Sequence, residues 1–376
     1  MRIARLSLRN FRSYAAAEVE LGPGVTVVTG RNGAGKTNLL DGLYFGCTGR
    51  SSRTTNEREL VRFGERVTRV VVITEAEDGP HELAVGFEPG EPKRMTVDGA
   101  RVERLLDAPG RPLVSVFLPD RLELVKGSPA LRRAHVDQVV AALWPSRVAT
   151  RRAYAQALAQ RNALLLRIRA AAASPASLSA WDAELAMHGI ALMADRAAAV
   201  DAVAERFGAR AADLGLDGDP RVAYRPRSKA ADAAGLAAEL AERRERDLER
   251  GFTVHGPHRD ELMLTREGRE LRAYGSQGQQ RLALLALLLA EREAIGRLRH
   301  APLMLLDDVM SELDAERRLR LAELLRGGGQ ALITATEAEH VPGAGEDGVV
   351  TINVEPGALV AAGRSPIMKA EGRSLR

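Results

Sequence analysis

The chain lacks residues and segments on which several classes of protein depend. Its 376 residues include a single cysteine, Cys47, so neither an internal disulfide nor a cysteine-based zinc site can form. The longest apolar run, Leu282–Ala290, is far too short to span a bilayer, and the charged, alternating start does not resemble a signal peptide. These absences favour a cytoplasmic protein with no membrane partner.

Lysine is also scarce, because 49 of the 54 basic residues are arginine. The net charge is only +4 and the sequence pI is about 9.4, which hints at a polyanionic partner and no more. Hydrophobic residues make up 45% and charged residues 28%, as in ordinary globular proteins. The length suits two domains, or one large domain with an insertion.

The first part of the chain has the sequence pattern typical of β-strands. Short alternating or β-branched segments recur up to residue 118, and Asp98-Gly99 between two extended segments predicts a hairpin. We expect extended segments at Arg2–Leu8, Val19–Leu21, Val25–Thr29, Val67–Thr74, Leu83–Phe87, Arg94–Val102 and Leu113–Leu118.

From Ser128 to about Phe207 the apolar residues follow helical spacing. Ser174-Pro175 divides this stretch into two halves, and a further charged helix is expected at Ala237–Glu249. No heptad pattern persists long enough for a long coiled coil. We therefore expect a mostly helical insertion.

After Gly251 the expected elements alternate between strands and helices. The expected strands are Phe252–His255, Glu261–Thr265, Leu271–Tyr274, Leu303–Leu306, Ala331–Thr334 and Val349–Val354. The expected helices are Gln277–Ile295 and Ala315–Leu325. The tail from Ala361 is expected to be disordered. An α/β fold with a β-rich part follows from this order.

The sequence GRNGAGKT at Gly30–Thr37 matches the phosphate-loop pattern G-x-x-x-x-G-K-[ST] in full. A hydrophobic strand precedes it and a helical stretch follows, so a chance glycine turn is a poor alternative. Its backbone N–H groups and the helix N-terminus would hold phosphate. Lys36 would reach the β- and γ-phosphates of ATP, and Thr37 would bind Mg²⁺. The residues expected to hold nucleotide here are Gly30, Arg31, Asn32, Gly33, Ala34, Gly35, Lys36, Thr37 and Asn38.

Four apolar residues, Leu303–Leu306, lead into Asp307 and Asp308. A buried strand would deliver Asp307 to the metal at its C-terminal end. ABC-type ATPases usually carry Glu at the position of Asp308, where it polarises the attacking water, and the shorter Asp needs that water to lie closer. Two exposed turn aspartates are an improbable alternative after four buried positions.

The segment Tyr274–Arg281, YGSQGQQR, resembles the signature of ABC-type ATPases, with Gln277 in place of the first glycine. Ser276 and the N–H of Gly278, with Gln279 beside them, would form a second cradle for the γ-phosphate at a helix N-terminus. In ABC ATPases this cradle completes the site of the opposite subunit. A plain helix cap fits the local sequence equally well, but the position just upstream of the LMLLDD strand favours the signature.

Other ABC features are partly present. Ser311–Asp314 resembles the D-loop, which crosses between subunits. The usual switch histidine is absent, and Thr334 and Thr336 are its possible substitutes. No Q-loop glutamine follows the strand at Leu113–Leu118, which ends in Pro119-Asp120. Both gaps predict slow hydrolysis.

Several segments together are similar to the RecF family. The opening Leu6–Tyr14 is similar to the N-termini of RecF proteins and of SMC-like heads. Phe117–Asp137, Gly251–Leu262 and Leu305–Asp314 resemble further RecF motifs. The resemblance runs from residue 1 to about 355 and its motifs are specific, so the chain is identified as a member of this family.

The resemblance implies an ABC-type ATPase head as lobe I, formed by residues 1–118 and 252–376, and a helical lobe II, residues 119–251, in place of a long coiled coil. It implies ATP and Mg²⁺ as ligands and a weak, DNA-stimulated ATPase. ATP would close a homodimer on duplex, gapped or single-strand/double-strand junction DNA. RecR would be the partner protein, with RecO and RecA as indirect partners in nucleoid-associated recombinational repair, replication restart and the SOS response.

Some polar residues have two interpretations. Arg12 either binds nucleotide phosphate, as in related heads, or is a surface arginine. Arg132 and Arg133 either contact DNA phosphates or cap a solvated helix. A dense polar cluster is a weak pattern for zinc, and we favour a role in positioning the signature region or the interface. The cluster consists of His255, His258, Arg259 and Asp260.

Three other classes of ATPase fit less well. The ATPase subunit of an ABC transporter would need the missing Q-loop glutamine and switch histidine, and a shorter insert than the roughly 240 residues between Thr37 and Ser276. A nuclease-associated SMC-like head would need coiled coils of hundreds of residues. An overcoming-lysogenisation-type ATPase would need a metal-nuclease domain, and neither fits within this length.

Overall fold

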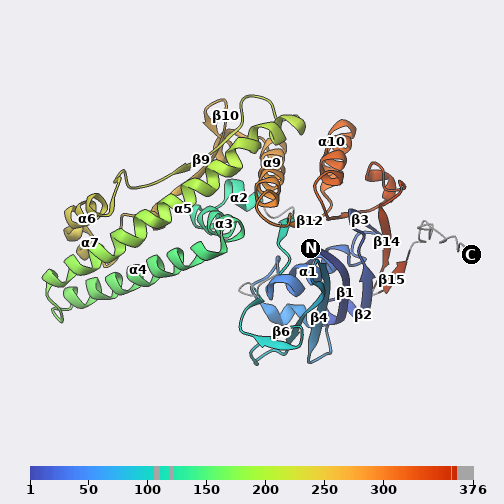
Figure 1. Cartoon of the computed structure of the whole chain (residues 1–376), viewed down its shortest axis with the longest axis horizontal. Helices are drawn as coiled ribbons and strands as arrows, with labels where there is room; N and C mark the ends of the chain where they lie inside the picture. The colour runs from blue at the N-terminus through green and yellow to red at the C-terminus, as the bar shows by residue number, and fades with distance from the viewer. Residues whose placement is uncertain (106–110, 119–121, 357, 362–376) are drawn as a thin grey trace, which may run out of the picture. The chain divides into compact units, whose positions relative to one another are not determined.

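The computed structural model describes residues 1–105, 111–118, 122–356 and 358–361. The chain divides into two compact units, Met1–Pro119 with His300–Arg376, and Asp120–Arg299 (Figure 1). The predicted tail lies, from residue 362 onward, outside the described residues, as does the Pro119-Asp120 pair that ends the strand where a Q-loop was sought.

The first unit contains a six-stranded sheet in the order β15-β14-β3-β13-β12-β8. Five neighbouring strands are parallel, and β15 pairs antiparallel with β14 at the edge. Every residue of β3 and β12 is buried, as expected for strands covered on both faces. The strands are β3 (Val25–Thr29), β8 (Val114–Phe117), β12 (Leu303–Leu306), β13 (Ala331–Ala335), β14 (Val350–Glu355) and β15 (Ala358–Ala361).

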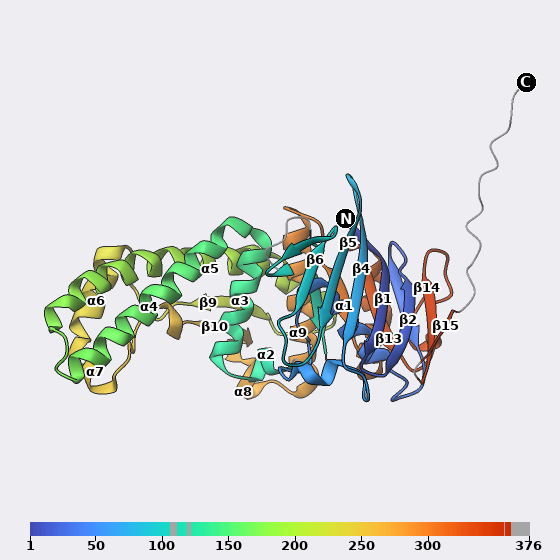
Figure 2. The ribbon, with the colours of Figure 1, turned by 90° about the horizontal axis from the view of Figure 1, so that it is seen from below.

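A second sheet of the same unit is antiparallel, in the order β2-β1-β4-β5-β6-β7, and Figure 2 shows most of these strands side by side. The predicted hairpin at Asp98-Gly99 is confirmed, with φ of 50° and 79° at the two turn residues. The strands are β1 (Arg2–Phe11), β2 (Tyr14–Glu20), β4 (Thr68–Ala76), β5 (Gly79–Phe87), β6 (Arg94–Val97) and β7 (Ala100–Val102).

Helix α1 (Lys36–Thr48) follows the phosphate loop and contacts β1, β4 and β5 of the antiparallel sheet as well as β13 of the parallel one. Two glycines allow this close packing: a Cβ on Gly42 would lie 2.7 Å from Leu8, and one on Gly46 would lie 2.5 Å from Val72. The helix and both sheets share one buried core. Helix α10 (Ala315–Arg326) connects β12 to β13.

The second unit is mostly helical, and α5 is its longest element, packing against α4, α6, α9 and β9. The break predicted at Ser174-Pro175 lies between α4 and α5. No described helix of the chain is both long and apolar enough to cross a membrane. The helices are α2 (Glu123–Lys126), α3 (Pro129–Leu143), α4 (Val148–Arg169), α5 (Leu178–Asp213), α6 (Ala233–Glu242), α7 (Arg244–Arg250), α8 (Leu271–Tyr274) and α9 (Gln277–Gly296).

A small antiparallel sheet completes this unit, in the order β11-β10-β9. Its strands are β9 (Arg221–Arg225), β10 (Glu261–Arg266) and β11 (Arg269–Glu270). Because β10 pairs with β9 and α9 packs against α5, residues 252–299 group with the helical unit, whereas the predicted division placed them in lobe I.

Three local predictions in this unit were wrong. Phe252–His255 is not a strand, because the N–H groups of Thr253 and Val254 donate to the side chains of Asn162 and Asp247 instead of to a neighbouring strand. Leu271–Tyr274 is the single-turn helix α8. The helix predicted at Ala237–Glu249 is two helices, α6 and α7, which separate at Arg243.

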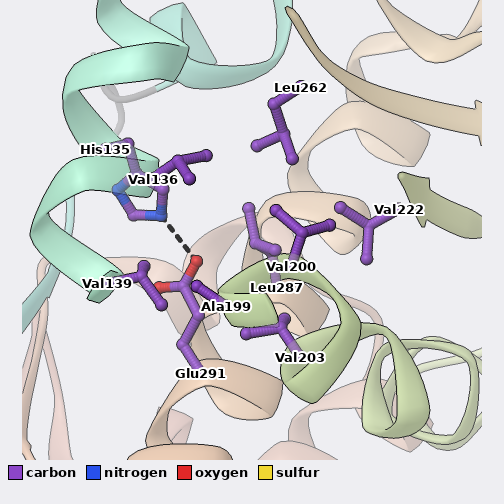
Figure 3. Close-up of a pocket in the computed structure, with 10 residues that line it drawn as sticks. All are labelled: His135, Val136, Val139, Ala199, Val200, Val203, Val222, Leu262, Leu287 and Glu291. Atoms are coloured by element: carbon purple, nitrogen blue, oxygen red, sulfur yellow. Dashed lines mark hydrogen bonds and ion pairs between the residues drawn. The ribbon is translucent and has the colours of Figure 1, made fainter. Parts of the chain in front are cut away.

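The second unit also contains a small, partly open apolar pocket between α3, α5, α9 and the β9–β10 pair (Figure 3). Its volume is about 10 Å³, enough for one water and far too small for a nucleotide. At its edge the ring of His135 lies 2.5 Å from a carboxylate oxygen of Glu291, which links α3 to α9.

Candidate nucleotide-binding site

The phosphate loop lies between the C-terminal end of β3 and the start of α1. At Gly30, where φ is 151°, a Cβ would lie 2.3 Å from the carbonyl oxygen of Val354 in β14, so only glycine fits beside that strand. Gly35 adopts φ of 118° and caps α1. Arg31, Asn32 and Gly33 are exposed, as a loop that receives a ligand must be.

Lys36 folds back across this loop. Its ammonium donates to the carbonyl oxygens of Gly30, at 2.7 Å, and Arg31, at 3.1 Å. Burial lowers the pKa of Lys36, while the charges of Asp308 and Asp307 act in the opposite direction. A positive charge is therefore held inside the loop, next to backbone groups of the same site.

Thr37 lies next to the two aspartates that follow β12. Its hydroxyl is 3.0 and 2.9 Å from the two carboxylate oxygens of Asp307. The hydroxyl of Thr334, at the end of β13, donates to Asp307 at 2.7 Å and accepts the backbone N–H of Asp308 at 2.9 Å. These contacts join the start of α1 to the C-terminal ends of β12 and β13.

Asp308 has a left-handed backbone, with φ of 48°, a conformation that Asp tolerates better than most residues. Its carbonyl oxygen accepts from the hydroxyl of Ser311 at 2.8 Å. Asp314, at the end of the D-loop segment, caps α10 by accepting from the N–H of Arg317 at 2.9 Å. The Asp308 side chain thus projects from a backbone fixed on both sides.

Ser276 is the N-cap of α9 in the second unit and forms a capping box with Gln279. The Gln279 N–H donates to the Ser276 hydroxyl at 3.2 Å, and the Ser276 N–H donates to the Gln279 side chain at 2.8 Å. Gln277 and Gly278 are exposed. The expected cradle is therefore an open, ordered helix start, and it belongs to a different unit from the phosphate loop.

Comparisons with known proteins agree with this geometry. A family model described as "AAA domain" matches residues 5–99. Over 95% of its length the chain is 38% identical to the DNA replication and repair protein RecF of Myxococcus xanthus, covering 96% of that protein. Over 92% of its length it is 39% identical to RecF of an Anaeromyxobacter species, also covering 96%.

The chain belongs to the RecF family.

Solved RecF structures extend this agreement to the fold. RecF-ATPrS from the RecFOR pathway matches 96% of the chain with a TM-score of 0.83 at 26% identity, covering 98% of that structure. An SMC head bound to the C-winged helix domain of ScpA matches 96% with a TM-score of 0.59 at 16% identity, covering 97% of that chain. The predicted fold class, an ABC-type ATPase head with a helical lobe and no long coiled coil, is confirmed.

In this RecF-family chain Arg12 does not lie free on the surface. Its guanidinium lies 2.7 Å from the buried carboxylate of Asp41 in α1, and its backbone N–H donates to Leu60. Asp41 also accepts from Ser51 and Ser52. Arg12 therefore supports α1 from outside, and its proposed contact with nucleotide phosphate stays a prediction.

Sequence reasoning missed two other supports of the phosphate loop in this RecF-family chain. The buried Tyr14 hydroxyl donates to the carbonyl oxygen of Gly35 at 3.0 Å, and Ser13 accepts from Asn38 at 3.0 Å. Asn38 also accepts from Arg53 at 3.1 Å, so its side chain is already engaged. The only sequence indication was the LRNFRSY segment itself, whose resemblance named no contact.

Three members of the polar cluster, His255, His258 and Asp260, make hydrogen bonds within the second unit, whereas Arg259 is exposed. His258 accepts from the Tyr154 hydroxyl at 2.7 Å and donates to the carbonyl oxygen of Thr253 at 2.9 Å, and burial lowers its pKa to about 4. His255 contacts Glu239 at 2.5 Å. Asp260 is fully buried and accepts from the Tyr224 hydroxyl and the Arg227 N–H. Among the described residues no group of three His, Cys, Asp or Glu side chains could hold a metal, so the zinc interpretation has no support.

Arg132 and Arg133 have different surroundings, although they are neighbours on α3. Arg132 is only 2% exposed and forms a bidentate pair with Glu261, at 2.6 and 2.9 Å, so the predicted contact with DNA was wrong. Its guanidinium does cap a helix, because it donates to the carbonyl oxygens of Val125 and Gly127 at the end of α2, but it does so from a buried position. Arg133 is half-buried and donates to the carbonyl oxygen of Asp260 at 2.9 Å.

Proposed function

We propose that this chain is an ATP-dependent DNA clamp of recombinational repair. It binds ATP in the first unit and dimerises with a second copy of itself around bound nucleotide. It holds duplex, gapped or single-strand/double-strand junction DNA and acts with RecR, and through RecO and RecA, at gaps. Slow ATP hydrolysis releases it.

The observation that carries this proposal is the contact between Thr37 and Asp307, at 2.9 to 3.0 Å. It joins the phosphate loop to the carboxylate after β12, which is the arrangement that a nucleotide-binding P-loop protein needs. The relatives are named as DNA replication and repair proteins, and the matching structures are of RecF-ATP and RecF-ATPrS in the RecFOR pathway. These names support the ligand and the pathway.

The site also suits Mg²⁺. The Thr37 hydroxyl and the Asp307 carboxylate are hard oxygen donors, and Mg²⁺ is usually held by one or two carboxylates together with substrate phosphates and water. When bound, the ion would offset the charge of the phosphates. The two residues that would hold it are Thr37 and Asp307.

Side chains of this chain would bind the phosphates, orient the attacking water and position the two aspartates. The Lys36 ammonium, now donating to two loop carbonyls, would transfer its hydrogen bonds to the β- and γ-phosphates. Asp308 would accept a hydrogen bond from the attacking water and orient it. Thr334 would fix both aspartates through its two hydrogen bonds. The exposed start of α9, with Ser276 and Gly278, would meet the γ-phosphate held by the second copy.

Size-exclusion chromatography with light scattering tests the proposal on the full chain. Samples would contain no nucleotide, ATP with Mg²⁺, or ATP with Mg²⁺ and a gapped duplex. We expect a monomer, then a dimer, then a dimer that co-elutes with DNA. A monomer at saturating ATP and Mg²⁺, with nucleotide binding verified separately, would overturn the proposal.

A further inference from the structure

The RecF-like motif at Gly251–Leu262 has a neighbour that the sequence did not reveal. Strand β9 pairs with β10 so that Arg225 lies opposite Glu261, and the backbone N–H of Arg227 donates to Asp260 at 2.7 Å. Helix α3 reaches the same place, because Arg133 donates to the carbonyl oxygen of Asp260. Three separate segments therefore bring basic side chains to residues 259–261.

The carboxylates at this place are already neutralised by inner arginines. Glu261 is held by the buried Arg132, at 2.6 Å. Asp260 lies 3.5 Å from the buried Arg196, which also pairs with Asp137 at 2.7 Å. The nearest ion-pair partners of Glu261 and Asp260 are thus buried arginines of the same unit.

An outer layer of arginines remains. Among the described residues, no carboxylate lies within 4.0 Å of the guanidinium groups of these side chains, and three of them are exposed while Arg133 is half-buried. Burial is the main cause that lowers the pKa of Arg133; the charges of Arg196 and Arg259 act in the same direction, and those of Glu261 and Asp260 act in the opposite one. The arginine patch consists of Arg133, Arg225, Arg227 and Arg259.

We infer that the arginine patch binds the phosphate backbone of a nucleic acid. This inference rests on the proposed function and names the surface of the second unit that carries out its DNA binding. Arginines that lack carboxylate partners are the groups that replace condensed counterions on DNA, and they supply sequence-independent affinity.

Two features favour a nucleic acid over an acidic protein. Arg225 ends β9 and Arg227 follows two positions later, after Pro226, so two exposed guanidinium groups come from one short segment and can contact neighbouring phosphates of one strand. Arg259 lies 5.5 Å from the ring centre of Phe252, which is 38% exposed, so an arginine and an aromatic face are offered together. Such pairs stack on unpaired bases, which occur at gaps.

The charge of the whole unit agrees with this choice. Residues 120–299 contain 29 lysines and arginines against 23 aspartates and glutamates. The remainder of the chain, with 25 basic and 27 acidic residues, has no such excess. The polyanion-binding character is therefore concentrated in the unit that carries the patch.

The test measures DNA binding by the full chain with fluorescence anisotropy, in ATP and Mg²⁺, over a range of about 50 to 200 mM salt. The probes are a fluorescein-labelled duplex and the same duplex with a single-stranded gap. The patch variant combines Arg225→Gln, Arg227→Gln and Arg259→Gln. The matched control removes the same charge from three exposed arginines that have ion-pair partners, through Arg66→Gln, Arg221→Gln and Arg297→Gln.

We expect the patch variant to bind DNA on the order of tenfold more weakly, or weaker still. Its plot of log affinity against log salt should flatten by about 0.9 for each phosphate that the protein no longer neutralises. The control should change much less, and both variants should bind ATP as the original chain does. Thermal melting followed by circular dichroism would verify that each variant is folded.

Equal salt dependence in the patch and control variants would overturn the inference while leaving the proposed function intact. Failure of the unsubstituted chain to bind DNA would instead overturn the proposed function. Poly-L-glutamate serves as a third probe. If the patch variant loses polyglutamate binding but keeps DNA binding, the partner is an acidic protein and the inference is wrong.

Discussion

The hydroxyl of Thr334 donates a 2.7 Å hydrogen bond to a carboxylate oxygen of Asp307, deep in the parallel sheet. The same oxygen atom of Thr334 accepts the N–H of Asp308, so one buried side chain fixes the two acidic residues at the end of β12. ABC-type ATPases usually have a histidine after the strand that corresponds to β13. Here Thr334 of β13 makes the hydrogen bonds that fix the two aspartates.

Thr334→Val should slow ATP turnover and leave ATP affinity nearly unchanged. Valine has the same shape but leaves the Asp308 N–H without an acceptor, which should also cost about 1–3 kcal/mol in the free energy of unfolding. Steady-state ATPase assays and chemical denaturation measure the two effects. Thr334→Ser should restore turnover, and Thr26→Val, at a buried threonine of β3, provides the control for a lost hydroxyl.

Lys36→Met should weaken ATP binding by about 30- to 150-fold, because a charge-assisted hydrogen bond of about 2–3 kcal/mol to phosphate is lost. Titration calorimetry with ATP and Mg²⁺ measures the affinity. Lys126→Met, at an exposed lysine of the other unit, should have no effect. Unchanged ATP affinity in the Lys36 variant would refute the assignment of the phosphate loop.

Asp308→Asn should reduce hydrolysis by on the order of 10²- to 10⁴-fold, because an amide orients water poorly and cannot take up a proton. With hydrolysis blocked, the ATP-bound dimer should persist. Light scattering after chromatography in ATP and Mg²⁺ would detect it, and a species that remains monomeric would count against the role of this residue.

Ser276→Arg should leave nucleotide binding within about twofold and prevent ATP-dependent dimerisation, because a long cation at the N-terminus of α9 opposes the helix dipole and fills the cradle. Ser177→Arg places the same side chain on an exposed serine elsewhere in the unit. If the Ser276 variant still dimerised, the signature would have no role between subunits.

The buried His258 should make the stability of the second unit depend on pH. Its pKa is near 4 in the folded chain and about 6.5 in the unfolded one, so the unfolded state binds the proton first as pH falls. The free energy of unfolding should therefore fall between pH 6.5 and 4, by an amount on the order of 2–3 kcal/mol. Urea titrations at several pH values would measure this loss. In His258→Gln the free energy of unfolding should fall less between pH 6.5 and 4, because the histidine is gone while Asp260 and the other titratable groups are unchanged. A variant with the unchanged pH dependence would contradict the prediction.

The sequence predicted those elements correctly whose residues form a recognisable local pattern. The buried runs of β3 and β12, the Asp98-Gly99 hairpin and the start of α9 at Ser276 were all predictable from local pattern. The prediction failed where an element forms only through contacts with residues far away in the sequence. Strand β9 was missed because its polar sequence gains strand geometry only by pairing with β10, some forty positions later.

The candidate site divides in the same way. Lys36 and Thr37 follow from a motif, yet nothing in the sequence indicates that Tyr14 supports Gly35. Thr334 was named from the sequence as a possible substitute for the switch histidine, but its bridge between two aspartates was not predicted. Arg132 is the clearest failure: as an arginine on a helix it was given a surface role, whereas it is buried against Glu261. A single arginine carries no local sign of which partner will cover it.

The position of β3 in its sheet also governs when the protein can become active during its own synthesis. β3 is made among the first thirty residues, but the strands on either side of it, β13 and β14, are made after residue 330. Residues 120–299, which are made before β13 and β14, form a compact unit, and compact units generally fold as units during synthesis. Asp307 is made 270 positions after Thr37. An incomplete chain can therefore contain a folded helical unit before its ATP site is assembled.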